Sequence, residues 1–211
     1  MTDTSKFIKD IKQSFRQMMD GSVSQSMRDK GVDYRLNWGA TVPRLREMAI
    51  ELRSRHSQDD LYHLSVALWK EDVRECKILA TMLMPVDRML PEVCDIWMEQ
   101  VPTQEIAEQL SFNLLQHLPY AAEKAYQWIA SSVEREQYCG FHVLTRLFMK
   151  GQEPNERGIN EYLDQALCAL QGADATVRKA AFQSLQRFAE LGLVYTRLAK
   201  SALKSVNLEL F

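Results

Sequence analysis

The chain has 211 residues and a formal net charge of −2, with 46% hydrophobic and 26% charged residues. This composition is typical of a soluble globular protein, and the small net charge excludes a uniformly basic nucleic-acid-binding protein. No apolar run approaches the roughly 20 residues that span a bilayer, and the N-terminus has no signal-peptide pattern. We therefore predict no membrane partner and a cytoplasmic location.

The sequence predicts an all-α fold, because runs of β-branched residues, which are typical of strands, are nearly absent. The first two helices are expected at residues 3–20 and 22–30. Thr41 is expected to cap a third helix that runs to about Arg55. Connections of two to six residues predict antiparallel packing of neighbours. The remaining helices are predicted at 58–68, 71–84, 88–99, 103–117, 120–130, 133–149, 156–170, 174–191 and 195–206.

Two of these helices, far apart in sequence, repeat the same register of small and apolar residues on one face. The matching positions are Val73, Cys76, Ala80 and Met84 in one and Val177, Ala180, Ser184 and Phe188 in the other. A repeated helix pair must stack on its neighbours to bury its apolar face, which predicts a solenoid with a long groove. We expect a single domain over 1–211, with an N-terminal helical cap at 1–31 and stacked helix pairs at 41–208.

Cysteine and tryptophan residues are expected to be structural. The cysteines form no C-x-x-C pair and are predicted to be buried free thiols, with a metal-binding or nucleophilic role as the alternative. The tryptophans are expected to wedge between neighbouring helices rather than to hold a ligand. These residues are Cys76, Cys94, Cys139, Cys168, Trp69, Trp97 and Trp128.

Charge is distributed unevenly along the chain. Residues 59–123 contain 4 basic and 12 acidic residues, a local charge of −8, whereas residues 176–208 contain 6 basic residues and one acidic residue, a local charge of +5. Such asymmetry is evidence about partners rather than about fold. The basic segment is either a solvated face or a surface for nucleic-acid phosphates.

Three sequence blocks, in this order, resemble the AlkD-like DNA alkylation repair family. They are Gly39-Ala-Thr-Val-Pro-Arg-Leu-Arg-Glu-Met-Ala49, Leu68-Trp69 followed by Asp72-Val-Arg-Glu-Cys76, and Trp128-Ile-Ala-Ser131. The resemblance implies a right-handed α-α superhelix (solenoid) of HEAT-like helix pairs. It further implies a basic concave face that holds duplex DNA and hydrolysis of the N-glycosidic bond of 3- and 7-alkylated purines. That chemistry needs no metal and no organic cofactor, so none is predicted.

The residues that would carry this chemistry depart from the family pattern. The resemblance places Glu108 where active members have a catalytic aspartate, which shifts the carboxylate by on the order of 1 Å. It places Gln104 and Gln183 at the two tryptophans of the family site and Tyr138 at its arginine. Gln104, Tyr138 and Gln183 are expected to line the groove beside the candidate acid. The alternative for Glu108, Tyr138 and Gln183 is that each is an ordinary surface or packing residue.

Basic residues supply candidates for contact with the DNA backbone. They are Arg146 in the helix predicted at 133–149, Arg178, Lys179 and Arg187 in the basic segment, and Arg44 and Arg46 near the N-terminus. Ion pairs on their own helix, for example between Arg46 and Glu51, are the alternative for the N-terminal pair.

The sequence leaves three functional hypotheses. The favoured one is a nucleic-acid-binding protein of this family with a degenerate glycosylase site. The first alternative is an active alkylpurine DNA glycosylase in which Glu108 replaces the aspartate. The second is a HEAT-type scaffold for a protein partner, which the acidic middle segment favours because it would repel duplex DNA.

Overall fold

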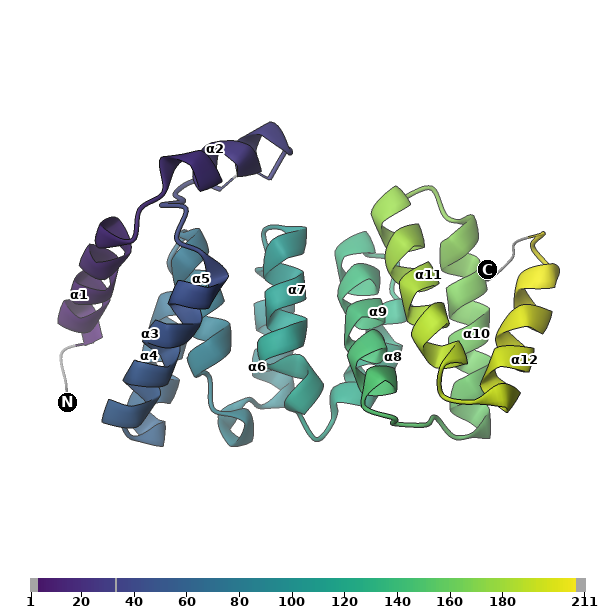
Figure 1. The fold of residues 1–211 in the computed structure, drawn as a ribbon. Coiled ribbons are helices and arrows are strands. Elements are labelled where there is room, and N and C mark those ends of the chain that lie inside the picture. Colours follow the sequence, from purple (N-terminus) through teal and green to yellow (C-terminus); the bar gives the residue numbers. More distant parts are fainter. Residues whose placement is uncertain (1–3, 33, 208–211) are drawn as a thin grey trace. The chain divides into compact units, whose positions relative to one another are not determined.

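The computed structural model describes residues 4–32 and 34–207, and within them every regular element is a helix. The all-α prediction is therefore confirmed. The predicted domain limits at residues 1, 208 and 211 lie outside the described residues. The α-helices are α1 (Thr4–Gln17), α2 (Gly21–Asp29), α3 (Val42–Arg55), α4 (Gln58–Trp69), α5 (Arg74–Leu83), α6 (Pro91–Glu99), α7 (Gln104–Asn113), α8 (Ala121–Ile129), α9 (Glu134–Met149), α10 (Glu156–Gln171), α11 (Ala175–Ala189) and α12 (Leu193–Lys204) (Figure 1). The 3-10 helices are η1 (Val86–Arg88) and η2 (Leu115–His117).

The predicted helices differ from the observed ones mainly at their ends. The helix expected at 71–84 begins only at Arg74, because Val73 is extended and the Arg74 amide donates to the carbonyl of Leu36 at 3.1 Å. The helix expected at 103–117 ends at Asn113 and is followed by η2. Thr41 occupies the N-cap of α3 as predicted, but its side chain makes no capping hydrogen bond.

The described chain divides into two compact units, and the first covers Met1–Leu114. In this unit α5 packs against α3, α4 and α7, and α1 packs against α4. Every residue of α5 is buried, including Arg74, Glu75 and Lys77. The polar start of α5 is therefore enclosed by the other helices of its unit.

Tryptophans join α4 to α6 in the first unit. The rings of Trp69 and Trp97 are stacked, with their centroids 4.2 Å apart and their planes inclined by 2°. The amine of Lys77 lies 4.6 Å from the centroid of the Trp69 ring and donates to the Trp69 carbonyl at 2.8 Å. Both tryptophans are buried, as is Trp128 in α8, which confirms their structural role.

The second unit covers Leu115–Phe211. Here α9 packs against α8 and α11, and α11 also packs against α10 and α12. Gly140 permits the close approach of α8 to α9, because a Cβ there would lie 2.8 Å from Cγ2 of Ile129 and 2.9 Å from the carbonyl oxygen of Ala125. The hydroxyl of the buried Tyr162 donates to Ser184 at 2.9 Å, so α10 and α11 are joined by a polar contact as well as by apolar packing.

The cysteine prediction is correct for three of four residues. Cys76, Cys94 and Cys139 are buried free thiols, but Cys168 is exposed. Its neighbours Tyr162, Ala166 and Ala169 form the buried stripe of α10, and Cys168 falls between these positions on the helix surface. Burial raises the pKa of Cys76 to about 12, so this thiol stays protonated at neutral pH.

Candidate functional site

The candidate acid Glu108 lies on an exposed stripe of α7 in the first unit. Gln104, Glu108 and Phe112 are four residues apart, and each of the three is exposed. This spacing places them on one face of the helix. The guanidinium of Arg46, from α3, lies 5.6 Å from the centroid of the Phe112 ring. The structure therefore brings one backbone candidate, Arg46, to the helix face that carries the candidate acid.

The other N-terminal candidates have different surroundings. Arg44 is exposed one residue before the buried Leu45. Glu51, the alternative ion-pair partner of Arg46, pairs with Arg55 at 2.7 Å. Arg46 instead contacts an aromatic ring, an arrangement that is favourable because a guanidinium is attracted to the negative face of the ring.

A buried polar network holds the start of α7 against α5. Arg74 donates from Nη2 to Oε1 of Glu105 at 2.6 Å and from Nε to Oε2 at 2.8 Å, which makes a bidentate ion pair. The hydroxyl of Tyr34 donates to Oε2 of Glu105 at 2.5 Å and contacts Thr103 at 2.7 Å. Burial disfavours the ionised carboxylate, but the hydrogen bonds and charge of Arg74 outweigh it and lower the pKa of Glu105.

The same network joins two of the sequence blocks that carry the family resemblance. Oε1 of the buried Glu75 accepts hydrogen bonds from the amides of Gly39 at 3.0 Å and Ala40 at 3.2 Å. Arg74 donates to the Ala40 carbonyl at 2.8 Å. Gly39 has a φ of +77°, and a Cβ there would lie 2.0 Å from the carbonyl oxygen of Asp20. These motif residues therefore fix the backbone rather than meet a ligand.

This network was not predicted from the sequence, although a signal for it was present. The stretch from Ile78 to Met84 is apolar apart from Thr81, which is typical of a buried helix. Charged residues in the first turn of such a helix must be paired, since an unpaired buried charge is costly. The partner Glu105 could not have been identified without the fold.

In the second unit, the candidates on α9 share one face. Tyr138, His142 and Arg146 follow at intervals of four residues. Tyr138 is only 8% exposed, and its ring centroid lies 4.5 Å from that of His142. Arg146 is half-buried two turns further along. The tyrosine is thus almost fully buried, whereas Arg146 adds a cation to this helix face.

The candidates on α11 separate into two groups. Lys179, Gln183 and Arg187 are exposed and lie four residues apart, so they form one stripe, which we call the α11 stripe. Arg187 also pairs with Glu190 at 2.7 Å. Arg178 faces another direction, because its Nη1 donates to the carbonyls of Gly172 at 2.7 Å and Ala173 at 2.6 Å, just after α10.

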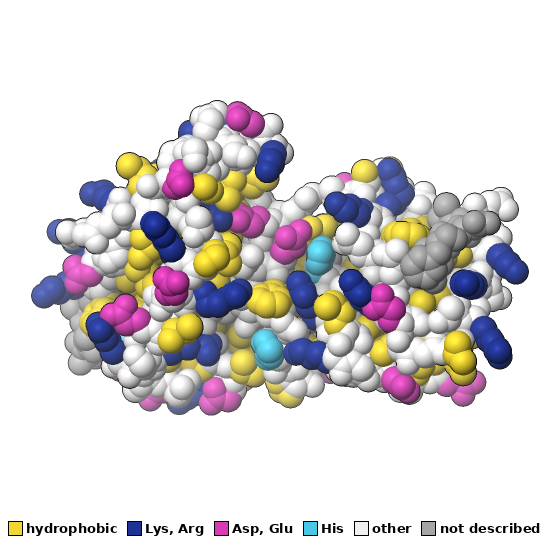
Figure 2. All heavy atoms as spheres, in the orientation of Figure 1, with side chains coloured by type: hydrophobic (Ala, Val, Ile, Leu, Met, Phe, Trp, Pro, Cys, Tyr) yellow, Lys and Arg dark blue, Asp and Glu magenta, His cyan; other side chains and the backbone are white. Residues whose placement is uncertain are grey.

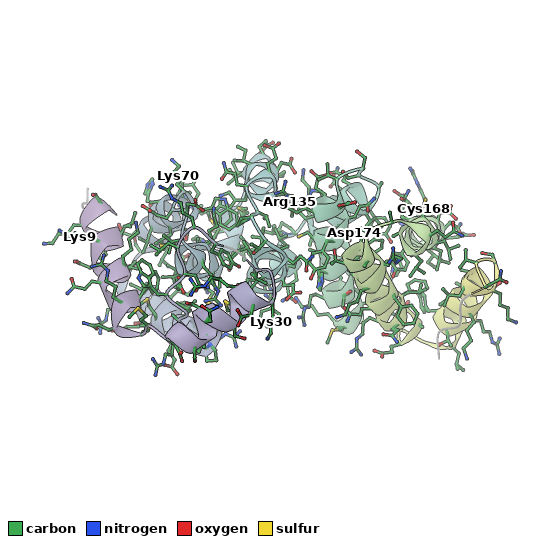
Figure 3. The ribbon with its side chains drawn as sticks, turned by 90° about the horizontal axis from the view of Figure 1, so that it is seen from above. Lys9, Lys30, Lys70, Arg135, Cys168 and Asp174 are labelled. Carbon is green, nitrogen blue, oxygen red and sulfur yellow. The ribbon has the colours of Figure 1, made fainter. Side chains whose placement is uncertain are left out.

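The start of α11 is held by its own cap. Oδ1 of Asp174 accepts hydrogen bonds from the amides of Thr176 at 2.8 Å and Val177 at 2.7 Å. The hydroxyl of Thr176 also donates to this carboxylate, and these bonds lower its pKa. Arg135 and Asp174 mark the N-terminal ends of α9 and α11 in Figure 3. Since α9 and α11 pack side by side, Arg146 and the α11 stripe belong to adjacent helices.

Charged side chains of both signs occur on the face that contains these helices. Lys and Arg side chains lie over α9 and α11 in Figure 2, interspersed with a few acidic ones. Gln104 and Glu108 belong to the first unit, and Tyr138 and Gln183 belong to the second. In the described ranges, no group of three or more His, Cys, Asp or Glu side chains is arranged to hold a metal ion. No helix of those ranges is both long and apolar enough to cross a membrane.

Comparison with known proteins defines the class of this fold and then the family. A solved structure described as "A new family of proteins related to the HEAT-like repeat DNA glycosylases with affinity for branched DNA structures" is similar to this chain, with a TM-score of 0.78 and 15% sequence identity. The similarity covers 94% of this chain and 82% of that chain, and at this identity it shows a HEAT-like repeat fold and no more. No curated protein sequence matches.

The family follows from the sequence itself. The profile of the family described as DNA alkylation repair enzyme matches residues 11–190. The chain therefore belongs to the DNA alkylation repair enzyme family, as the three sequence blocks predicted. The roles of individual site residues stay predictions.

Proposed function

We propose that this protein binds the phosphate backbone of duplex DNA, including branched duplexes, through basic side chains of α9 and α11, without an intact glycosylase site. The α11 stripe carries this proposal. Lys179 and Arg187 present cations on either side of Gln183, at the position where the family resemblance expects a tryptophan. The α11 stripe therefore has cations that can bind the DNA backbone, but it has a glutamine in place of the tryptophan expected for a glycosylase site.

Charge supports backbone binding despite the acidic middle segment. Several of its carboxylates are already paired, including Glu105 with Arg74, Glu71 with Lys12 and Asp59 with Arg88. Paired carboxylates repel phosphates less than free ones do. The ion pair between Arg187 and Glu190 is exposed and worth at most about 1 kcal/mol, so a phosphate can displace it. The branched target is proposed by extension from the similar solved structure, whose description includes affinity for branched DNA.

A binding experiment tests the α11 stripe. The double variant Lys179→Ala, Arg187→Ala is expected to bind duplex DNA more weakly at low salt. The slope of log affinity against log salt concentration is expected to fall by about two, one for each phosphate contact removed. The control is Lys30→Ala with Arg157→Ala, which removes two exposed cations, one at the C-cap of α2 and one in α10. Equal affinities and equal salt slopes for the wild type and the α11 double variant would refute the proposal.

Arg178→Ala serves as a separate comparison, because the structure assigns this side chain to the end of α10. It is expected to lower the thermal unfolding temperature by removing hydrogen bonds to the Gly172 and Ala173 carbonyls. Its effect on DNA affinity is expected to be smaller than that of Lys179→Ala. A larger effect would place the binding surface nearer to the α10–α11 connection.

A second candidate function is an active alkylpurine glycosylase that uses Glu108. One observation favours it, since Glu108 is exposed on α7 one turn before Phe112, over which Arg46 lies. A carboxylate placed near the sugar would stabilise an oxocarbenium-like transition state, and an alkylated cationic base is already a good leaving group. Release of alkylated bases by the wild type, but not by Glu108→Ala, would favour this candidate over the first.

A further inference from the structure

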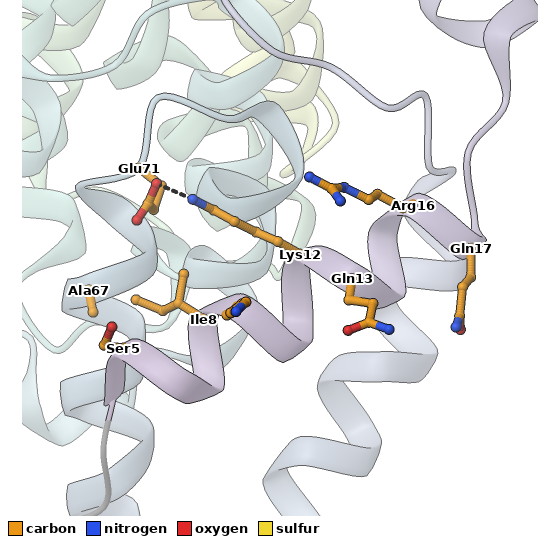
Figure 4. A pocket seen from close by; sticks show the side chains of 9 residues that line it. Ser5, Ile8, Lys12, Gln13, Arg16, Gln17, Ala67 and Glu71 are labelled. Carbon is orange, nitrogen blue, oxygen red and sulfur yellow. Dashed lines mark hydrogen bonds and ion pairs between the residues drawn. The ribbon is translucent and has the colours of Figure 1, made fainter.

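A basic trough lies beside α1 in the first unit. It has a volume of about 1040 Å³ and is open to solvent, and α1 contributes most of its lining. The lining residues that matter here are Lys9, Lys12, Gln13, Arg16, Ala67 and Glu71. We call this concavity the α1 trough (Figure 4).

The cations of the trough share one face of α1. Lys9, Lys12 and Arg16 are separated by three and four residues, which places them on the same side of the helix. Lys12 reaches to Glu71 and pairs with it at 2.5 Å, and Arg16 extends toward the same side (Figure 4). Lys9 projects outward from α1 (Figure 3). Within the described ranges Lys9 and Arg16 have no ion-pair partner, so the trough carries an excess of positive charge.

The dimensions of this row suit a polyanion. From residue 9 to residue 16 a helix rises about 10 Å, and a DNA strand carries one phosphate per about 3.4 Å of duplex axis. The row is therefore long enough to contact more than one phosphate of a strand. The amide of Gln13 adds a hydrogen-bond donor of the kind that contacts phosphate oxygens. An open shape matches a chain that passes across the surface better than a small ligand that must be enclosed.

The trough is separate from the candidate site on α7. Helix α1 packs against α4, whereas α7 packs against α5. We propose that the α1 trough binds the phosphate backbone of a second arm of branched DNA, while the basic side chains of α9 and α11 hold the first. This inference rests on the proposed function, because it assumes that the protein binds DNA.

The trough is tested by measuring the affinity of the protein for two forms of DNA, each in a separate experiment. The variant Lys9→Ala with Arg16→Ala is compared with the wild type on a four-way junction and on a linear duplex of the same total length. Junction affinity is expected to fall by at least about tenfold at 0.1 M salt, with the salt slope reduced by about two contacts. Linear duplex affinity is expected to change by less than about twofold. The control Lys30→Ala with Arg157→Ala is expected to leave both affinities unchanged.

A second variant acts in the opposite direction. Glu71→Gln removes the acid of the trough and releases Lys12, so junction affinity is expected to rise, which a merely structural role would not produce. Unchanged junction affinity in both variants, with wild-type binding intact, would overturn the trough alone and leave the α11 proposal standing. Equal losses on junction and linear duplex would also overturn it, since the trough would then serve the first arm. Absence of DNA binding by the wild type would instead refute the proposed function.

Discussion

At the residue scale, the buried side chain of Arg74 joins three parts of the first unit. Its side chain is 1% exposed, and it bonds to Glu105, Glu75 and the carbonyl of Ala40. An arginine in such a position contributes little net stability over an apolar residue of the same shape. Its removal is costly, however, because the carboxylates around it would stay buried without a partner.

Arg74→Ala is therefore expected to lower the free energy of unfolding by about 3–5 kcal/mol, measured by urea denaturation. The matched control is Arg55→Ala, which breaks the exposed pair with Glu51 and is expected to cost less than about 1 kcal/mol. Similar losses in the two variants would contradict the structural role assigned to Arg74.

Because Glu105 is ionised in its ion pair with Arg74, the stability of the fold is expected to fall at acid pH. Its pKa in the folded protein is lowered from the ordinary 4.5, so the ionised form stabilises the fold above that pH and the stabilisation is lost as pH falls through the folded pKa. Between about pH 5 and pH 3 the wild type is expected to lose more stability than Glu105→Gln. Parallel losses, followed by urea denaturation at each pH, would show that this carboxylate is not strongly paired.

Residue-scale contacts are the part of the molecule that the sequence predicted least. The buried positions of Trp69 and Trp97 followed from their place on helices that are otherwise aliphatic, but their stacking did not. Cys168 was expected to be a buried free thiol because it belongs to no C-x-x-C pair, and the structure exposes it. The pairing of Arg74 with Glu105 joins residues 31 positions apart, and such a contact depends on the fold rather than on local spacing.

At the scale of elements, the sequence predicted the helices well, because small and apolar residues recur at intervals of three and four and proline or glycine interrupts them. The errors lie at ends that tertiary contacts determine. Arg74 begins α5 where its amide bonds to Leu36, a contact that no local pattern reports.

The contact between α8 and α9 gives a prediction at this scale. Gly140→Ala would introduce a Cβ 2.9 Å from the carbonyl oxygen of Ala125, which is backbone and cannot rotate away. The expected loss is about 1–3 kcal/mol of unfolding free energy, because the two helices must separate slightly. Gly21→Ala is the control, since a Cβ there meets nothing within 4 Å and should be tolerated. Equal stability of both variants, measured by thermal denaturation, would contradict the close packing at Gly140.

At the scale of the whole molecule, family membership and charge distribution favour DNA as the binding partner. The candidate catalytic positions, however, depart from the family pattern. Sequence blocks predicted the family because they lie where the fold is fixed, as Gly39, Arg74 and Glu75 show. They could not predict activity, since the candidate acid and the aromatic positions lie on exposed helix faces that tolerate change. Six basic residues give residues 176–208 their local charge of +5. Lys179 and Arg187 belong to the exposed α11 stripe, Arg178 bonds to backbone carbonyls, and Arg197, Lys200 and Lys204 belong to α12.

The central claim is that the protein binds DNA without releasing alkylated bases. The most direct test measures release of 7-methylguanine and 3-methyladenine from methylated duplex DNA by the wild type and by Glu108→Ala, with duplex binding followed at two salt concentrations. We predict no release by either protein and binding that weakens steeply with salt. Release by the wild type that disappears in Glu108→Ala would contradict the claim and establish a glycosylase whose catalytic carboxylate is a glutamate.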